Sequence, residues 1–212
     1  MGIDKNEAVV LFHGLGLHAF FMRRIAAFLK KDGYDVCNID YPSRRDTIER
    51  MTVHLYNLLE EKKLDGYKSV HFIGHSLGGV LVRNLLYRYR FHNQGKVIAL
   101  APPNKGSVLV DIFKKYAPVR WYFGPAFLEL GSGSVFLEQL AYIPDNYYVI
   151  AGNRSKGTLF GFLFNEVNDG AVSVEDSIAE GMIRSHHSVL PVTHFTILYN
   201  KKVIDKILEV LK

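Results

Sequence analysis

Hydrophobic positions along this chain follow two alternating patterns, short apolar runs and longer runs with helical spacing. Residues 9–12 are all apolar and are followed by His13-Gly14, which is typical of a buried strand and a turn. Residues 20–30 carry apolar side chains at helical spacing and stop before Gly33. The alternation continues, and predicts strands at 34–39, 69–73, 96–100, 147–151 and 185–190 and helices at 46–63, 77–91 and 195–211, the last one broken near Asn200.

Strands that alternate with helices imply crossover connections, and these build a parallel sheet covered on both faces. The pattern therefore predicts an α/β fold with a mostly parallel sheet of about six strands, in a single domain over residues 1–212. Residues 107–143 depart from the alternation and are too long for a bare loop, so we expect a small helical flap there and no large cap domain.

Aromatic residues concentrate in this flap and in a second cluster at 158–164. They could line a substrate groove or touch a lipid surface, although such clusters more often belong to the core. The candidates for substrate contact are Trp121, Phe123, Phe127 and Phe162.

Composition narrows the class of protein. The 212 residues are 48% hydrophobic and 22% charged, which excludes a disordered chain. One cysteine, Cys37, excludes a disulfide within the chain and a multi-cysteine metal site, and we expect an inert buried thiol. No metal or cofactor is expected. Residues 1–7 are polar and no apolar run approaches the ~20 residues of a membrane span, so we expect no export signal and a cytoplasmic location.

The net charge of +5 makes nucleic acid the first partner to consider. The cations are dispersed, however, and the arginines and tyrosines of residues 87–90 stand at the end of a predicted helix, where cations complement the helix dipole. We therefore expect no nucleic-acid partner. A weak attraction to anionic membrane surfaces stays open.

The strongest chemical signal is the segment 72–79, which contains Gly74-His75-Ser76-Leu77-Gly78 between a predicted strand and a predicted helix. A turn from strand to helix in so few residues forces a strained backbone at the serine, and the flanking glycines remove side chains that would clash. The serine hydroxyl is thereby presented at a helix N-terminus, where developing negative charge is favoured. This arrangement predicts a nucleophile at Ser76.

A serine needs a base, and the base needs an orienting acid. Asp169 and His194 follow the fifth and sixth predicted strands, in the order that suits this sheet. The competitors fit less well. Asp145 precedes its strand, Glu175 and Asp176 fall in an expected helix, His186 and His187 lie within an expected strand, and the His75 side chain should project away from the hydroxyl.

The turn after the first strand supplies the second half of the predicted site. Backbone N–H groups of Leu15 and Leu77 could together hold an oxyanion, while His13 stabilises the turn. The same turn also fits a dinucleotide-binding fingerprint, Gly14-x-Gly16-x-x-Ala19, with Asp40 for the ribose. That alternative leaves the serine motif, Asp169 and His194 without a role.

At these motifs, together with residues 101–107, the sequence resembles the α/β-hydrolase superfamily, in particular small lipases, esterases and lipid deacylases. The resemblance implies an α/β-hydrolase core with Ser76 as nucleophile, Asp169 as acid, His194 as base and Leu15 and Leu77 as oxyanion donors. The expected function is hydrolysis of small-molecule or lipid carboxylic esters through an acyl-enzyme. Two alternatives stay open, an acyl-thioesterase with the same triad and an inactive scaffold that kept the fold.

Overall fold

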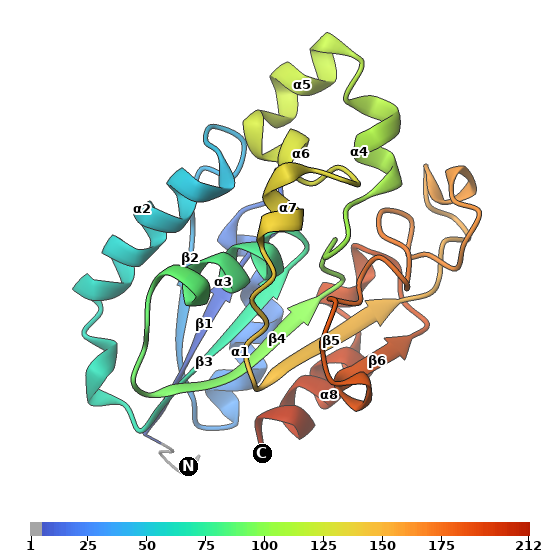
Figure 1. Ribbon diagram of the computed structural model, residues 1–212. Coiled ribbons are helices and arrows are strands. Elements are labelled where there is room, and N and C mark those ends of the chain that lie inside the picture. Colours follow the sequence, from blue (N-terminus) through green and yellow to red (C-terminus); the bar gives the residue numbers. More distant parts are fainter. Residues whose placement is uncertain (1–5) are drawn as a thin grey trace.

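A computed structural model describes residues 6–212 and places a six-stranded sheet at the centre of the molecule (Figure 1). Its strands are β1 (Glu7–Phe12), β2 (Asp35–Ile39), β3 (Ser69–His75), β4 (Gln94–Leu100), β5 (Tyr147–Gly152) and β6 (His187–Leu190). Their order is β2-β1-β3-β4-β5-β6, and every neighbouring pair is parallel. The predicted parallel α/β sheet is confirmed, and its strands all end at one edge.

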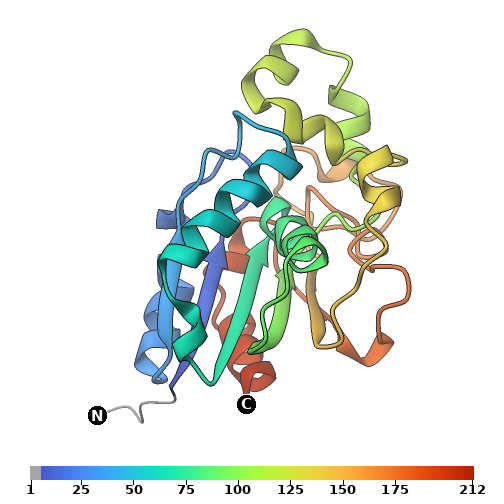
Figure 2. The same cartoon turned by 60° about the vertical axis from the view of Figure 1, so that its left-hand side comes forward.

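Two layers of helices cover the two faces of this sheet (Figures 1 and 2). The main helices are α1 (Arg23–Lys31), α2 (Ile48–Glu61), α3 (Leu77–Arg88) and α8 (Lys201–Leu211). Successive side chains of a strand point to opposite faces. In β1, Val10 and Phe12 therefore join the core under α2 and α3, whereas Val9 and Leu11 join the core under α1 and α8.

Side-chain caps explain where two helices begin. Thr47 accepts the N–H of Arg50 at 3.3 Å, so α2 begins at Ile48. The break predicted near Asn200 is also present, because the Asn200 side chain accepts the N–H of Lys202 at 2.8 Å and opens α8. Short 3₁₀ turns occupy η1 (Ala19–Met22), η2 (Leu64–Gly66), η3 (Gly161–Leu163), η4 (Arg184–His186) and η5 (Thr196–Leu198).

The flap forms four short helices beyond the carboxyl edge of the sheet (Figure 1). They are α4 (Val108–Phe113), α5 (Ala117–Phe123), α6 (Pro125–Glu129) and α7 (Val135–Gln139). Buried Arg83 of α3 holds the return of this segment, since its guanidinium donates to the carbonyls of Leu140 at 2.5 Å and Tyr142 at 3.3 Å. The flap boundaries 107–143 and the single-domain division stay predictions.

Three further expectations concern exposure and location. Cys37 is half-buried and not fully buried as predicted, and burial raises the pKa of its thiol. No helix within residues 6–212 is long and apolar enough to cross a bilayer. The expectation of no export signal depends on residues 1–7, of which 1–5 lie outside the described residues.

Candidate active site

Ser76 occupies the sharp turn between β3 and α3. Its backbone has φ of +52° and ψ of −120°, a conformation that costs a residue with a side chain ~1–3 kcal/mol. Two hydrogen bonds hold it there, from Ser76 N to the Leu100 carbonyl and from Gly79 N to the Ser76 carbonyl, both at 2.9 Å. The strain therefore persists because the surrounding backbone fixes it.

The glycines beside the serine allow backbone segments to meet. A Cβ built at Gly74 would lie 2.3 Å from the Gly78 carbonyl carbon, and one built at Gly78 would lie 2.4 Å from the Phe12 carbonyl oxygen. Real Cβ atoms essentially never come so close. The start of α3 is thus seated directly on the end of β1.

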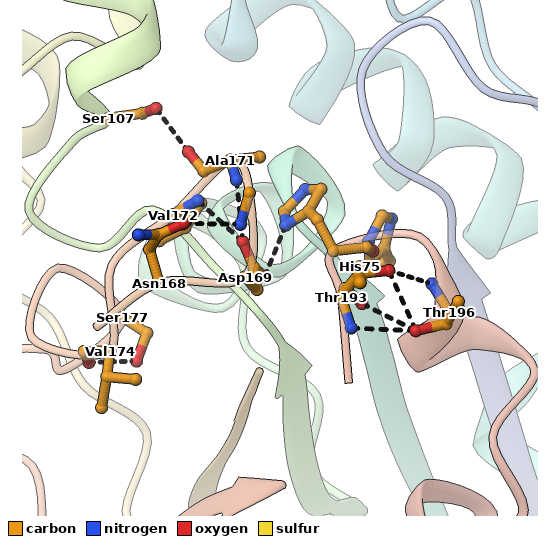
Figure 3. A network of polar contacts seen from close by, with 12 residues as sticks. His75, Ser107, Asn168, Asp169, Ala171, Val172, Val174, Ser177, Thr193 and Thr196 are labelled. Atoms are coloured by element: carbon orange, nitrogen blue, oxygen red, sulfur yellow. Dashed lines mark hydrogen bonds and ion pairs between the residues drawn. The ribbon is translucent and has the colours of Figure 1, made fainter. Parts of the chain in front are cut away.

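Asp169 and His194 are joined by two hydrogen bonds although 25 residues separate them. The His194 ring donates from Nδ1 to Oδ2 of Asp169 at 2.8 Å, and the His194 backbone N–H donates to the Asp169 carbonyl at 2.8 Å. The other carboxylate oxygen accepts the N–H groups of Ala171 at 3.0 Å and Val172 at 2.9 Å (Figure 3). Three N–H donors therefore satisfy the buried carboxylate of Asp169.

This contact fixes the state of the His194 imidazole. With Nδ1 donating to a carboxylate, Nε2 is left as the proton acceptor, which is what a general base needs. The ring lies beside the turn at Ser76, because His75 Nε2 is 2.9 Å from the His194 carbonyl and the two rings are 4.8 Å apart. Within residues 6–212 the Ser76 hydroxyl makes no hydrogen bond. Catalytic hydrogen bonds in unliganded sites often form only when substrate binds.

Two backbone N–H groups near Ser76 are free to hold an anion. Leu77 is the first residue of α3, and Leu15 lies in the turn after β1. Across the described part of the chain neither N–H has a protein acceptor. The neighbouring Gly16 N–H donates to the Ser43 hydroxyl at 3.0 Å, so the turn is held while the Leu15 N–H stays available.

His13 and Tyr41 fix the base of this turn. The His13 ring stacks on Tyr41 with centroids 4.0 Å apart, donates from Nδ1 to the Gly14 carbonyl at 2.9 Å, and has its pKa lowered by burial. The Tyr41 hydroxyl donates to the His13 carbonyl. Asp40, the acid that a dinucleotide site would need for ribose, accepts the Ala19 N–H at 2.9 Å and lies 3.2 Å from His13 Nε2. It is engaged in holding the turn.

The rival acids and histidines have other partners. Glu175 and Asp176 lie in a single turn, so the helix expected there is wrong. The Ser173 hydroxyl accepts the Asp176 N–H at 2.9 Å and the Ser173 carbonyl accepts the Ser177 N–H at 3.1 Å, and the turn is not continued into a helix. Glu175 pairs with Lys105 at 2.6 Å. His186 belongs to η4 and not to a strand, and stacks on Tyr148, whereas His187 lies 2.9 Å from the Ser177 hydroxyl. Among the described residues no three metal-type ligands gather.

His75 is a contact that the sequence reasoning did not find. Its buried ring lies against Gly14, bonds to the His194 carbonyl, and has a pKa held well below the usual range by burial and by His194. The alternation of side chains between the two faces of β3 indicates where the His75 ring lies. His75 shares a face with Ile73, which packs in the core under α1 and α8, where the His194 segment also lies.

The four aromatic candidates for substrate contact fall into different environments. Trp121 and Phe162 are 87% and 80% exposed. Phe127 is buried in the core, and Phe123 is half-buried and stacked on it with ring centroids 5.3 Å apart. For Phe127 the core environment is the alternative that the sequence left open.

Comparisons with known proteins bear on the family and the fold of this chain. The model of the alpha/beta hydrolase family matches residues 9–181. A lysosomal thioesterase, PPT2-B of Xenopus laevis, is 29% identical over 117 residues, which cover 52% of this chain and 41% of that protein. The mature lipase BlEst2 of Bacillus licheniformis superposes with a TM-score of 0.79 at 21% identity, covering 100% of this chain and 94% of the lipase. The metagenomic carboxyl esterase MGS0156 superposes with a TM-score of 0.72 at 20% identity, covering 91% of this chain and 66% of the esterase.

Proposed function

The chain belongs to the alpha/beta hydrolase family, as its motifs indicated, and from this premise we propose that it is a serine hydrolase of carboxylic esters. The observation that carries the proposal is the pair of hydrogen bonds between Asp169 and His194 beside the strained turn at Ser76. A buried acid that orients an imidazole next to a serine at a helix N-terminus is the arrangement that activates a hydroxyl.

The mechanism follows from these positions. Ser76 Oγ attacks the ester carbonyl carbon while His194 Nε2 takes the hydroxyl proton, and the carbonyl oxygen becomes an oxyanion held by the Leu15 and Leu77 N–H groups. The C–O bond to the alcohol then breaks, and His194 returns its proton to the leaving alkoxide. Water then attacks the acyl carbon while His194 Nε2 takes one of its protons, the C–O bond to Ser76 Oγ breaks, and His194 returns that proton to Oγ as the carboxylic acid leaves.

The role of Asp169 gives a sharp test. In Asp169→Asn the side-chain oxygen would stay with the Ala171 and Val172 N–H groups, and the amide nitrogen would face His194 Nδ1. Nδ1 would then have to accept, so the proton would move to Nε2 and the ring could no longer take the serine proton. We expect kcat to fall roughly 10⁴-fold with little change in folding.

Glu175→Gln is the matched control for this test, because Glu175 is an exposed acid paired with Lys105. It should hydrolyse p-nitrophenyl butyrate at the parent rate. Loss of activity in Glu175→Gln with full activity in Asp169→Asn would show that the acid has been assigned wrongly.

A fluorophosphonate probe distinguishes a hydrolase from an inactive scaffold, since it reacts only with an activated serine. We expect one label, mapped to Ser76, and none in Ser76→Ala. Folded protein that stays unlabelled would favour the scaffold.

A thioesterase is the second candidate, and the printed name of the Xenopus laevis relative supports it. The same triad attacks both kinds of carbonyl. Paired oxygen-ester and thioester substrates with one acyl chain decide between them, because only the leaving atom differs. A kcat/KM higher for the thioester by tenfold or more would make the thioesterase the preferred reading.

A further inference from the structure

Two aromatic projections stand at the carboxyl edge of the sheet. The first is α5, with Trp121 and Tyr122, and the second is the loop 155–164, with Leu159 and Phe162; together we call them the aromatic rim. These four side chains are 87%, 54%, 75% and 80% exposed. Helix α5 buries none of its residues. Large apolar side chains gathered at one edge of a surface usually mark a contact with another phase or partner.

The aromatic rim is built directly on the candidate active site. Phe123, the last residue of α5, lies 3.8 Å from a Cβ built at Gly16 in the predicted oxyanion turn. The loop 155–164 rests on the Asp169 segment, since Thr158 lies 2.6 Å from a Cβ built at Gly170. Figure 1 shows α5 and the loop after β5 on the same side of the sheet, beyond the ends of the strands.

The charges on the aromatic rim have one sign. Residues 114–128 contain Lys114, Lys115 and Arg120 and no acidic residue, and residues 153–164 contain Arg154 and Lys156 and no acidic residue. All five cations are exposed. Lys114 pairs with Asp111 at 2.8 Å, Arg120 and Lys156 lie within the aromatic rim, and Lys115 and Arg154 flank it in sequence. The next acidic residues along the chain are Glu129 and Glu166.

We propose that the aromatic rim docks on a lipid surface that contains anionic headgroups. Tryptophan and tyrosine favour the boundary between water and lipid, and exposed lysines and arginines are attracted to anionic headgroups. Docking in this orientation would place the candidate site against the lipid surface. The proposal goes beyond the hydrolase function and is tested without it.

Trp121 makes the contact measurable, because it is the single tryptophan of the chain. Binding is followed in Ser76→Ala, which cannot form an acyl-enzyme, so loss of the hydrolase proposal would leave this result untouched. Vesicles of phosphatidylcholine alone are compared with vesicles in which roughly a third of the lipid is phosphatidylglycerol. We expect co-sedimentation with the anionic vesicles, a shift of Trp121 emission to shorter wavelength, and loss of both at high salt.

Substitutions then locate the surface. Phe162→Ser should weaken partitioning into the vesicles about tenfold, because a buried aromatic contact is lost. The double variant Lys115→Glu, Arg120→Glu should weaken partitioning by tenfold or more, because each lost cation costs ~fivefold in binding. Tyr87→Ser is the matched control, since Tyr87 is 61% exposed near the end of α3, at the opposite edge of the sheet. Circular dichroism checks that each variant is folded.

Three results would overturn the proposal. One is the absence of binding to anionic vesicles, and another is equal weakening by Tyr87→Ser. The third is a Trp121 emission that changes with protein concentration but not with vesicles, which would assign the aromatic rim to a contact between copies of the chain.

Discussion

Gly78 offers the most direct test of how the nucleophile turn is built, through the substitution Gly78→Ala. The added Cβ would meet the carbonyl oxygens of Phe12 at 2.4 Å and His13 at 2.6 Å. Both atoms belong to the backbone and cannot rotate away. To reach even 3.0 Å, α3 and the end of β1 must separate by about 0.6 Å, and such overpacking costs ~1–3 kcal/mol. The expected fall in Tm is roughly 2–12 °C for a chain of this size.

The same displacement reaches the predicted oxyanion donors. Leu77 precedes Gly78 on α3 and Leu15 lies two residues after His13, so a separation of the two segments moves their N–H groups apart. Loss of one donor typically slows acyl transfer by about 10²–10³-fold. Gly78→Ala should therefore react with a fluorophosphonate more slowly by that order, at a temperature where it is folded.

Two other glycines provide graded controls, measured by thermal denaturation and by labelling rate. A Cβ at Gly79 would touch the Ala99 and Pro102 side chains at 3.0 and 3.1 Å, and one at Gly66 would meet nothing within 4 Å. We expect Gly66→Ala to be neutral or slightly stabilising, and Gly79→Ala to fall between the two. If Gly78→Ala keeps the parent Tm and labelling rate, the close approach of α3 to β1 has no energetic role.

Three further predictions concern buried polar groups. Burial lowers the pKa of His75 below its ordinary 6.5, so under pH 6.5 the unfolded chain binds a proton that the folded chain excludes. The free energy of unfolding should therefore decrease as the pH is lowered below 6.5, by up to about 1.4 kcal/mol per pH unit. Urea titrations should give a shallower pH slope in His75→Gln, with His13 and His187, lowered by burial in the same direction, supplying the remainder. Arg83→Met leaves the Leu140 and Tyr142 carbonyls without their donor, and should lower the free energy of unfolding by about 1–3 kcal/mol in urea; an unchanged midpoint would contradict this. Tyr41→Phe removes the donor to the His13 carbonyl and should cost about 1–2 kcal/mol by thermal denaturation, whereas an unaltered Tm would show that water replaces it.

The order of elements and the candidate triad could be predicted because they depend on local patterns. The central strands contain short apolar runs, and a parallel sheet brings the segments after β3, β5 and β6 to one edge whatever the details of the loops. The choice of Asp169 over Glu175 needed only the position of each relative to a strand. The hydrogen bond from His194 to Asp169 is a consequence of that shared edge.

The aromatic residues of the flap could not be assigned in the same way. Phe127 lies in α6, which buries two residues in the core, whereas Phe123 ends α5, which only packs against that core with partly buried side chains. Helices of five and seven residues are too short for a periodic pattern to reveal a buried face. The contact of His75 with the His194 carbonyl was missed for a related reason. It joins segments 119 residues apart, and no local rule specifies which loop will cover the end of a strand.

Because Ser76 has a positive φ, the residue that would be most stable at position 76 differs from the one that the proposed chemistry needs. Glycine would fit that backbone without penalty, so Ser76→Gly, which would lack the proposed nucleophile, should be more heat-stable than the parent chain. Directed evolution for heat tolerance would therefore need a screen for product formation in every round, or position 76 would drift towards the residue that relaxes the turn.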